Sequence, residues 1–374
     1  MNVAIDFSRR MSGGGIAHAK GLLESKPSVE FNIEKVFVFS SWKFLDKIPD
    51  KPWIIKKSHS WLNKSTFWQM LWQLYYFKKE VKKYNCSSVL FPAASTLVTT
   101  PKCVVMSRDM LPFERVEVNR YARLSFAWFR LIALRQIYIS SLRKAIVPLY
   151  LTKYAADVTS EIIGKRKHVI IPHGVNPDYI GKSKNKCEWP DNSSKPIKCI
   201  YISTIAYYKH QWKVLEAVSM LREEGYNIEI SFVGGSRKEA LKLFNKSKFQ
   251  IDPDERFHKL YPFIPNEQLP DMILDHHVYI FASSCENMPN TLLEGMALGM
   301  PIVSSNRGPM MEVLGDGGLY FDPEDSASIS KTLKRIISDK NLRNESSNNA
   351  INKSSEYSWK KTSFETFKLL SELG

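Results

Sequence analysis

The sequence predicts an α/β protein of two domains, each built on a mainly parallel sheet. The chain has 374 residues, enough for about two domains of ordinary size. Short apolar strands alternate with helical stretches in both halves, as they do in parallel sheets with crossover helices. The polar segment 181–196, with two prolines and many Lys, Asn and Ser residues, separates the two halves and is expected to be a linker.

The first half begins with the apolar segment VAIDF, which we expect to be the first strand of its sheet. Further apolar segments predict strands at 35–39, 88–92, 102–106, 144–149 and 168–172. Helices are expected at 19–25 and over a long stretch from about residue 113 to 158.

The second half restarts the alternation with a strand at 197–203 and a helix at 212–225. Buried strands are expected at 228–235, 277–283 and 301–305, followed by a polar helical tail from about residue 325. Ligands of open α/β sheets bind beyond the carboxyl ends of the strands. We therefore expect a site in the cleft where two such domains face each other.

The composition is that of an ordinary globular protein, with 44% hydrophobic and 24% charged residues. No apolar run reaches the roughly 18 residues of a membrane span, and the N-terminus predicts a strand rather than a signal peptide. The cysteines are odd in number and scattered, without metal-ligand spacing, so they predict neither a disulfide framework nor a zinc site. A reduced, cytoplasmic protein is expected.

The most informative segment is SSCENMPNTLLEGMALGMPIVSS, which holds Glu286 and Glu294. It predicts an acidic loop that leads into a helix, with Pro289 in the first helical turn. Gly299 and Pro301 end that helix before a buried strand. The start of the helix offers backbone N–H groups and a positive dipole end to an anion. The two carboxylates are suited to accept hydrogen bonds from sugar hydroxyls, although a capped surface helix with unrelated carboxylates would have the same pattern.

With its neighbours in order along the chain, this segment resembles the family 4 retaining glycosyltransferases, which have the GT-B fold of two Rossmann-like domains. The other segments are SGGGIA, SRDMLPF, VIIPHGVN and STIAYYKH. The resemblance implies an acceptor-side domain at 1–172 and a nucleotide-sugar domain at 173–355. It also implies a C-terminal helix at 356–374 that crosses back to the first domain.

The resemblance assigns Glu286 to the transferred sugar and Glu294 to the ribose of the nucleotide. The donor phosphate is expected at the opening of the helix. The residues expected to line that opening are Asn287, Met288, Pro289, Asn290 and Thr291.

Two further loops of the resemblance concern the diphosphate. Gly14 and Gly15 lie in the early glycine turn, which allows close backbone approach to a ligand, although such a turn is often structural. Lys209 can reach a diphosphate as a point charge. The family usually has arginine five residues before this lysine, where Thr204 stands here, and Arg307 is the expected substitute.

Arg108 and Asp109 occupy the place of a His-Asp pair in the family. Arginine cannot act as a base at neutral pH, but it can hydrogen-bond a sugar or stabilise phosphate charge, and Asp109 is expected to hold it. A surface ion pair is the alternative. His173 lies at the expected hinge between the halves, where a structural role is favoured over a catalytic one, and it is also counted among the residues expected to bind substrate.

No metal is expected. The Asp252-Pro253-Asp254 segment is the one Asp-x-Asp pattern considered for a metal, and its proline favours a turn. Metal-independent action suits a GT-B enzyme in which a helix dipole and cations neutralise the leaving diphosphate.

The net charge of +15 requires a partner. Residues 61–84 and 115–144 are basic and rich in aromatics, which suits the interface of an anionic membrane. In the first stretch we expect Trp68, Trp72 and Tyr75 to contact headgroups while neighbouring lysines meet anionic lipid. Core aromatics with solvated lysines are the alternative. Nucleic acid is not expected, because no recognition module is present.

Together these observations predict a hexosyltransferase at the inner face of the membrane. It would use a nucleotide-sugar donor and no cofactor, and its acceptor would be a glycan or a polyprenyl-pyrophosphate-linked glycan of surface polysaccharide assembly. A nucleotide-sugar 2-epimerase of the same fold and a non-catalytic nucleotide-sugar or polysaccharide-binding subunit are the alternatives. Epimerisation of donor alone, or binding without turnover, would distinguish them.

Overall fold

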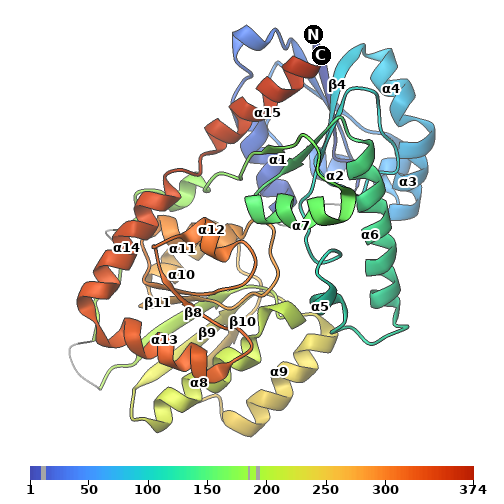
Figure 1. The fold of residues 1–374 in the computed structure, drawn as a ribbon. Coiled ribbons are helices and arrows are strands. Elements are labelled where there is room, and N and C mark those ends of the chain that lie inside the picture. The colour runs from blue at the N-terminus through green and yellow to red at the C-terminus, as the bar shows by residue number, and fades with distance from the viewer. Residues whose placement is uncertain (10–13, 184–185, 191–193) are drawn as a thin grey trace. The chain divides into compact units, whose positions relative to one another are not determined.

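The computed structural model describes residues 1–9, 14–183, 186–190 and 194–374 (Figure 1). The chain forms two compact units. Unit 1 comprises Met1–Gly174 and Tyr357–Gly374, and unit 2 comprises Val175–Glu356. The segment expected as a linker, 181–196, falls within unit 2, and its residues 184, 185 and 191–193 lie outside the described part of the chain.

Unit 1 is built on a parallel sheet of seven strands in the order β3-β2-β1-β4-β5-β6-β7. The strands are β1 (Asn2–Asp6), β2 (Lys35–Phe39), β3 (Ile54–Lys57), β4 (Cys86–Phe91), β5 (Cys103–Met106), β6 (Val147–Tyr150) and β7 (Val169–Ile170). The central strands are almost wholly buried, as expected when helices cover both faces of a parallel sheet.

The helices of unit 1 connect these strands. They are α1 (Gly14–Glu24), α2 (Trp42–Leu45), α3 (Thr66–Tyr75), α4 (Phe77–Lys83), α5 (Arg115–Val118), α6 (Phe126–Lys144), α7 (Lys153–Ile163) and α15 (Trp359–Leu373), with short 3₁₀ turns at Val29–Phe31 and Ser60–Asn63. The stretch expected to be helical over about 113–158 contains three helices and the strand expected near 144–149, because Ser125 caps a new helix and VPLY is fully buried in the sheet.

The last helix, α15, packs on α1 and β4 within unit 1 (Figure 1). Gly21 permits this contact, since a Cβ at this position would lie 2.1 Å from the ring of Trp359. The Ser363 hydroxyl donates to the carbonyl of Leu22 at 2.9 Å. The carboxyl-terminal end of the chain is therefore a structural part of its amino-terminal sheet.

Unit 2 has a six-stranded parallel sheet in the order β10-β9-β8-β11-β12-β13. The strands are β8 (Ile197–Ile202), β9 (Ile228–Val233), β10 (His258–Tyr261), β11 (Val278–Phe281), β12 (Ile302–Ser305) and β13 (Leu319–Phe321). The helices are α8 (Gln211–Glu223), α9 (Lys238–Ile251), α10 (Leu269–Leu274), α11 (Asn290–Ala297), α12 (Met310–Leu314), α13 (Ser326–Ser338) and α14 (Lys340–Ser354), with 3₁₀ turns at Pro177–Tyr179 and Tyr207–Lys209.

One expectation about the basic aromatic stretch 61–84 is wrong. Trp72 does not face solvent but is 1% exposed in the core of unit 1. Its ring lies 5.9 Å from that of Phe39 and 5.8 Å from that of Phe77. The helical spacing that aligned Trp72 with Tyr75 could not show which face packs on the sheet. Among the described helices, none is long and apolar enough to cross a membrane.

Candidate functional site

The candidate site of unit 2 lies at the carboxyl ends of β8 and β11. These neighbouring strands are where the strand order reverses, because β9 and β10 lie on one side of β8 while β12 and β13 lie beyond β11. Such a switch point leaves a crevice between two loops that diverge from adjacent strands. The loop after β8 carries Lys209 and the loop after β11 carries Glu286.

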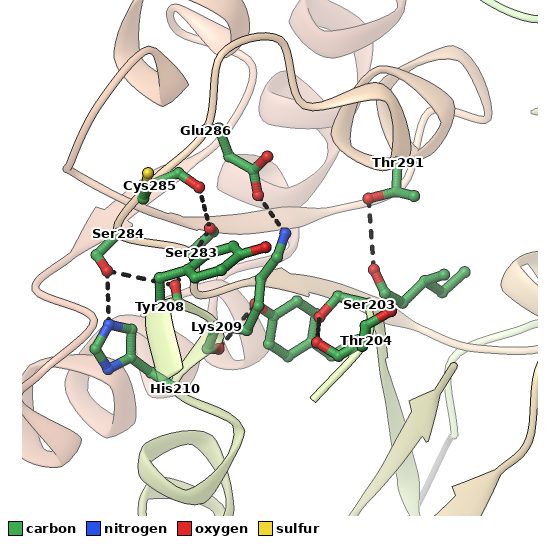
Figure 2. A network of polar contacts seen from close by, with 12 residues as sticks. Ser203, Thr204, Tyr208, Lys209, His210, Ser283, Ser284, Cys285, Glu286 and Thr291 are labelled. Atoms are coloured by element: carbon green, nitrogen blue, oxygen red, sulfur yellow. Dashed lines mark hydrogen bonds and ion pairs between the residues drawn. The ribbon is translucent and has the colours of Figure 1, made fainter. Parts of the chain in front are cut away.

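Lys209 and Glu286 form an ion pair across this crevice (Figure 2). Their side chains keep only 12% and 17% of their surface exposed. The ammonium also lies 5.1 Å from the ring centroid of Phe281 and 5.5 Å from that of Tyr208. Desolvation strengthens the interaction of the ammonium with a nearby anion, and the aromatic faces stabilise the buried cation. The sequence predicted both residues for the site, and the structure brings them together.

The two loops are joined by a network around His210. Its Nε2 lies 2.8 Å from the Ser284 hydroxyl, which also donates to the Tyr208 carbonyl at 3.3 Å (Figure 2). The Ser284 N–H donates to the same carbonyl at 2.8 Å. The Tyr201 hydroxyl donates to the carbonyl of Lys209 at 2.9 Å. His210 itself adopts a left-handed conformation at φ 50°. These bonds fix the backbone from which Lys209 extends, so its ammonium is preorganised.

The helix after Glu286, α11, is held close to the sheet. Gly295 faces Tyr279 of β11, and a Cβ at Gly295 would lie 3.1 Å from that ring. The Tyr279 hydroxyl donates to the carbonyl of Thr291 at 2.8 Å. The Thr291 hydroxyl in turn donates to Ile202 at the end of β8, at 3.4 Å (Figure 2). The amino-terminal end of α11 is thereby anchored at the switch point, with its positive dipole end at the crevice.

The segment before α11 differs from the expectation in one position. Pro289 is not within the first turn but is the N-cap, and the helix begins at Asn290. Asn287 and Met288 of this segment are buried. The segment is thus packed into unit 2, and its backbone is fixed next to Glu286.

Glu294 lies in the second turn of α11, beside Tyr179. Burial raises the pKa of the Glu294 carboxyl to about 8, although the neighbouring Tyr179 hydroxyl lowers it in part. A carboxyl with such a pKa is largely protonated at neutral pH and can exchange its proton for a hydrogen bond from a ligand. Perturbed carboxyls of this kind gather at functional sites.

Thr204, at the position of the family's arginine, lies in the loop that follows β8. Gly234 packs against this loop at φ 136°, where a Cβ would lie 2.7 Å from the carbonyl oxygen of Ser203. Gln211 Nε2 donates to the Thr204 carbonyl at 3.2 Å and to the Ser203 hydroxyl at 2.8 Å. The loop is therefore rigid, but Thr204 brings no positive charge to the crevice.

Arg307 follows β12, the strand next to β11. Its guanidinium forms an ion pair with Asp322 at 2.8 Å, with the two side chains 49% and 38% exposed. In this exposed pair the guanidinium of Arg307 is occupied by Asp322, and its charge is neutralised there. Substitution of the absent arginine by Arg307 stays a prediction that requires the ion pair to open.

In unit 1, Gly14 and Gly15 form the start of α1, Gly14 exposed and Gly15 buried. The preceding residues of the glycine turn, 10–13, lie outside the described residues. Arg108 follows β5, and burial lowers the pKa of its guanidinium to about 10, so it stays charged at neutral pH. Asp109 is exposed and accepts a hydrogen bond from the N–H of Leu111 at 3.0 Å.

His173 is buried in unit 1, where its Nε2 lies 2.9 Å from His18 Nδ1. Its ring is 5.2 Å from that of Trp359 in α15. A Cβ at the adjacent Gly174 would lie 2.0 Å from the backbone nitrogen of Trp359. These are the contacts of a residue that holds α15 in place, whereas the prediction that His173 binds substrate has no support among them.

The Asp252-Pro253-Asp254 segment is a turn. Asp252 accepts hydrogen bonds from the N–H groups of Arg256, Phe257 and His258 at 2.8–3.1 Å, and His258 Nδ1 lies 2.7 Å away. Four donors therefore occupy its carboxylate, whose pKa they lower against the effect of burial. Within the described part of the chain, no cluster of three His, Cys, Asp or Glu side chains has metal-binding geometry.

The structure adds site residues that the sequence did not single out. Tyr179 lies beside Glu294, while His210, Ser284 and Tyr208 join the two loops. His210 directly follows Lys209, so the segment STIAYYKH contained a signal for it. Tyr179 lies far from Glu294 in sequence, and no local pattern connects them.

Comparison with known proteins agrees with this geometry. Residues 183–353 match the family model of group 1 glycosyl transferases. The O-antigen chain mannosyltransferase B of Escherichia coli is 30% identical over 111 residues, which are 29% of this chain and 29% of that protein. This match thus spans less than a third of the curated relative.

Solved structures match over the full length. Sucrose-phosphate synthase from Thermosynechococcus elongatus has a TM-score of 0.77 at 14% identity, covering 100% of this chain and 98% of that one. Anabaena HepE in complex with UDP-glucose has a TM-score of 0.71 at 14% identity, covering 100% of both chains.

The two parallel-sheet units therefore form a GT-B fold, the architecture of a large class of glycosyltransferases. In its second unit, over residues 183–353, the chain is similar to the group 1 glycosyl transferases.

Proposed function

We propose that the protein is a retaining, metal-independent hexosyltransferase of surface polysaccharide assembly. Its donor would be a UDP- or GDP-linked sugar, and its acceptor a lipid-linked or oligosaccharide glycan. The O-antigen mannosyltransferase among the relatives supports a role in surface polysaccharide assembly. The UDP-glucose complex among the similar structures supports a nucleotide-sugar donor.

The observation that carries the proposal is the Lys209–Glu286 pair at the switch point, beside the amino-terminal end of α11. A nucleotide diphosphate placed there meets an ammonium and a helix dipole. Glu286 then becomes available to a hydroxyl of the transferred sugar, because the diphosphate takes over part of the ammonium's charge.

In the proposed reaction, the bond between the anomeric carbon and the diphosphate oxygen breaks and its electron pair stays on the diphosphate. Lys209 and the α11 dipole stabilise that growing negative charge. The acceptor hydroxyl attacks the same face of the sugar and passes its proton to the leaving phosphate. Glu294 would accept hydrogen bonds from the ribose. No metal is needed, since these groups supply the positive field.

The excess of Lys and Arg supports a peripheral location at the cytoplasmic face of an anionic membrane, where a polyprenyl-pyrophosphate-linked acceptor resides. A lipid-linked acceptor would bring both its own negative charge and a negative surface to the enzyme. Location and acceptor are parts of the proposal.

The test begins with thermal-shift screening of UDP- and GDP-linked hexoses, because a ligand of the folded state raises its apparent stability. The stabilising donor is then incubated with purified protein and a lipid-linked glycan, and NMR defines the anomeric configuration of the product. We expect retention, and only when acceptor is present. Epimerised donor without acceptor would indicate the 2-epimerase, and donor binding without turnover would indicate a non-catalytic subunit.

A further inference from the structure

The connection between α5 and α6 carries an unusual group of exposed apolar side chains. Val116, Leu124, Phe126 and Phe129 are 67%, 76%, 85% and 51% exposed. We call these four side chains, together with the exposed arginines Arg115, Arg123 and Arg130, the α5–α6 tip. Single exposed apolar residues are ordinary on soluble proteins, but four large ones within fifteen residues form a group that requires a partner.

The tip is structurally supported rather than loose. Val118 and Tyr121 are buried, and Glu117 forms a 2.8 Å ion pair with Arg120 while only 5% of its side chain is exposed. Ser125 caps α6 by accepting the N–H of Trp128 at 3.2 Å. The tip lies at the lower end of α6 in Figure 1. Its apolar groups are therefore displayed by an anchored backbone.

The backbone at Leu124 adds a second observation. Leu124 has φ 67°, in the left-handed region that branched side chains rarely adopt. Such strain persists where surrounding structure imposes it, and it gathers at functional places. Phe126 and Phe129, three residues apart at the start of α6, lie on one face of the helix. Three large apolar groups thus stand next to one another in sequence and at the surface.

The charge around the tip identifies the partner. Residues 115–144 contain seven Arg or Lys and a single acid, Glu117, which is buried and paired. The exposed charge of the tip is therefore wholly positive. Apolar side chains ringed by cations, on a helix too polar to span a bilayer, match the headgroup region of an anionic membrane.

We infer that the α5–α6 tip inserts Leu124, Phe126 and Phe129 into the headgroup region of an anionic lipid surface while Arg115, Arg123 and Arg130 contact lipid phosphates. This inference rests on the proposed function only for the membrane location of the acceptor. It adds the tip to the surface of α3 and α4, where Trp72 is in the core but Phe67 and Tyr75 are each 62% exposed.

The experiment measures partition of the full chain onto vesicles of phosphatidylcholine alone or mixed with phosphatidylglycerol, at low and high salt. In the apolar variant, Leu124→Ser, Phe126→Ser and Phe129→Ser are combined, and partition onto mixed vesicles should fall at least about tenfold. In the charge variant, Arg123→Gln and Arg130→Gln are combined. Its partition should fall about 25-fold on mixed vesicles, near fivefold for each cation, and stay unchanged on phosphatidylcholine.

The matched control combines Phe249→Ser and Phe263→Ser, because these residues of unit 2 are 78% and 75% exposed. It should bind vesicles as the unchanged protein does. Equal binding of the apolar variant and the unchanged protein overturns the inference, as does an equal loss in the control. A change of oligomeric state of the apolar variant in lipid-free sedimentation also overturns it, because the tip would then be a protein interface.

Donor binding, measured by calorimetry on the same variants, separates this inference from the proposed function. Tip variants that release the vesicles but bind nucleotide-sugar normally support the inference. If the unchanged protein binds no nucleotide-sugar while its vesicle binding depends on the tip, the proposed function fails and the inference stands.

Discussion

Lys209 and Glu286 pair across the crevice between the loops that follow β8 and β11. Without ligand, each charge is neutralised by the other. A diphosphate that enters the crevice competes with Glu286 for the ammonium, so binding of the anion and release of the carboxylate are coupled. This relationship connects the phosphate-binding and sugar-binding parts of the site through one pair of side chains.

We expect Lys209→Ala to lower kcat more than it weakens donor affinity. The negative charge of the leaving diphosphate grows as the glycosidic bond breaks, so a cation here stabilises the transition state more than the bound donor. Loss of such a stabilising group commonly lowers kcat by about 100-fold or more. Steady-state kinetics with calorimetry of donor binding separate the two effects. Lys213→Ala is the control, because Lys213 pairs with Glu216 on the nearby helix. A change confined to KM would favour Arg307 as the catalytic cation.

Glu294→Ala should weaken nucleotide binding more than Glu286→Ala, since Glu294 is assigned to the ribose and Glu286 to the sugar. Loss of a buried hydrogen-bonding carboxyl costs about 1.5–3 kcal/mol, or roughly 10- to 150-fold in Kd. Calorimetry with UDP and GDP, which lack the transferred sugar, measures the contribution of the ribose contact to affinity without that of the sugar contact. Unchanged affinity in both variants would contradict the assignments.

The raised pKa of Glu294, about 8, predicts that nucleotide binding releases a proton. Ribose hydroxyls that donate to the carboxylate favour its charged form, so affinity should rise between pH 6 and pH 8, toward tenfold per pH unit. Calorimetry in two buffers of different ionisation enthalpy counts the released protons. Glu294→Gln should abolish the release, and an unchanged proton count would show that another group titrates.

The same pKa predicts how stability depends on pH. The folded carboxyl holds its proton more tightly than the unfolded one, whose pKa is near 4.5. Its contribution is therefore complete below pH 4.5 and is lost as pH rises through 8. Relative to Glu294→Gln, the unchanged protein should lose free energy of unfolding over this window, as urea titrations at several pH values will show. Parallel curves for the two proteins would exclude the effect.

Gly21→Ala should destabilise unit 1, although alanine favours a helix more than glycine does. The added Cβ would lie 2.1 Å from the Trp359 ring and displace α15, at a cost of about 1–3 kcal/mol. Thermal unfolding measures the loss. Gly235→Ala is the control, because no atom lies within 4 Å of its Cβ position. Addition of Trp359→Leu to Gly21→Ala should cost less than the two single losses together.

Transfer should persist after exhaustive EDTA treatment, because the proposed site neutralises the diphosphate with Lys209 and the α11 dipole. The assay compares treated protein with and without added Mg²⁺ or Mn²⁺. Activity that vanishes and returns with metal would overturn the metal-independent mechanism. Asp252, whose carboxylate is occupied by four donors, would then remain an unsuitable ligand.

The sequence predicted the central strands well because they are apolar on both faces. The strands at Ile54–Lys57, His258–Tyr261 and Leu319–Phe321 were not predicted, and all three lie at sheet edges. An edge strand packs on fewer neighbours, so segments such as IIKK and HKLY contain little of the apolar pattern on which prediction depends.

The site was predictable where its residues lie close in sequence. Glu286 and Glu294 stand in one loop-and-helix segment, whose start and end follow from local capping and turn chemistry. The Lys209–Glu286 pair joins loops 77 residues apart, and only the order of strands in the sheet places them together. Residue type alone could not show that Trp72 is buried while Phe126 is exposed, because that depends on which helical face meets the sheet.

The return of α15 to unit 1 sets an order of assembly during synthesis. Unit 2 is one uninterrupted stretch, Val175–Glu356, and can complete its sheet as soon as that stretch has left the ribosome. Unit 1 is begun first but waits for Tyr357–Gly374, so α1 and β4 lack their cover until the end. Unit 1, whose first part is translated before unit 2, is therefore the unit whose fold is completed last.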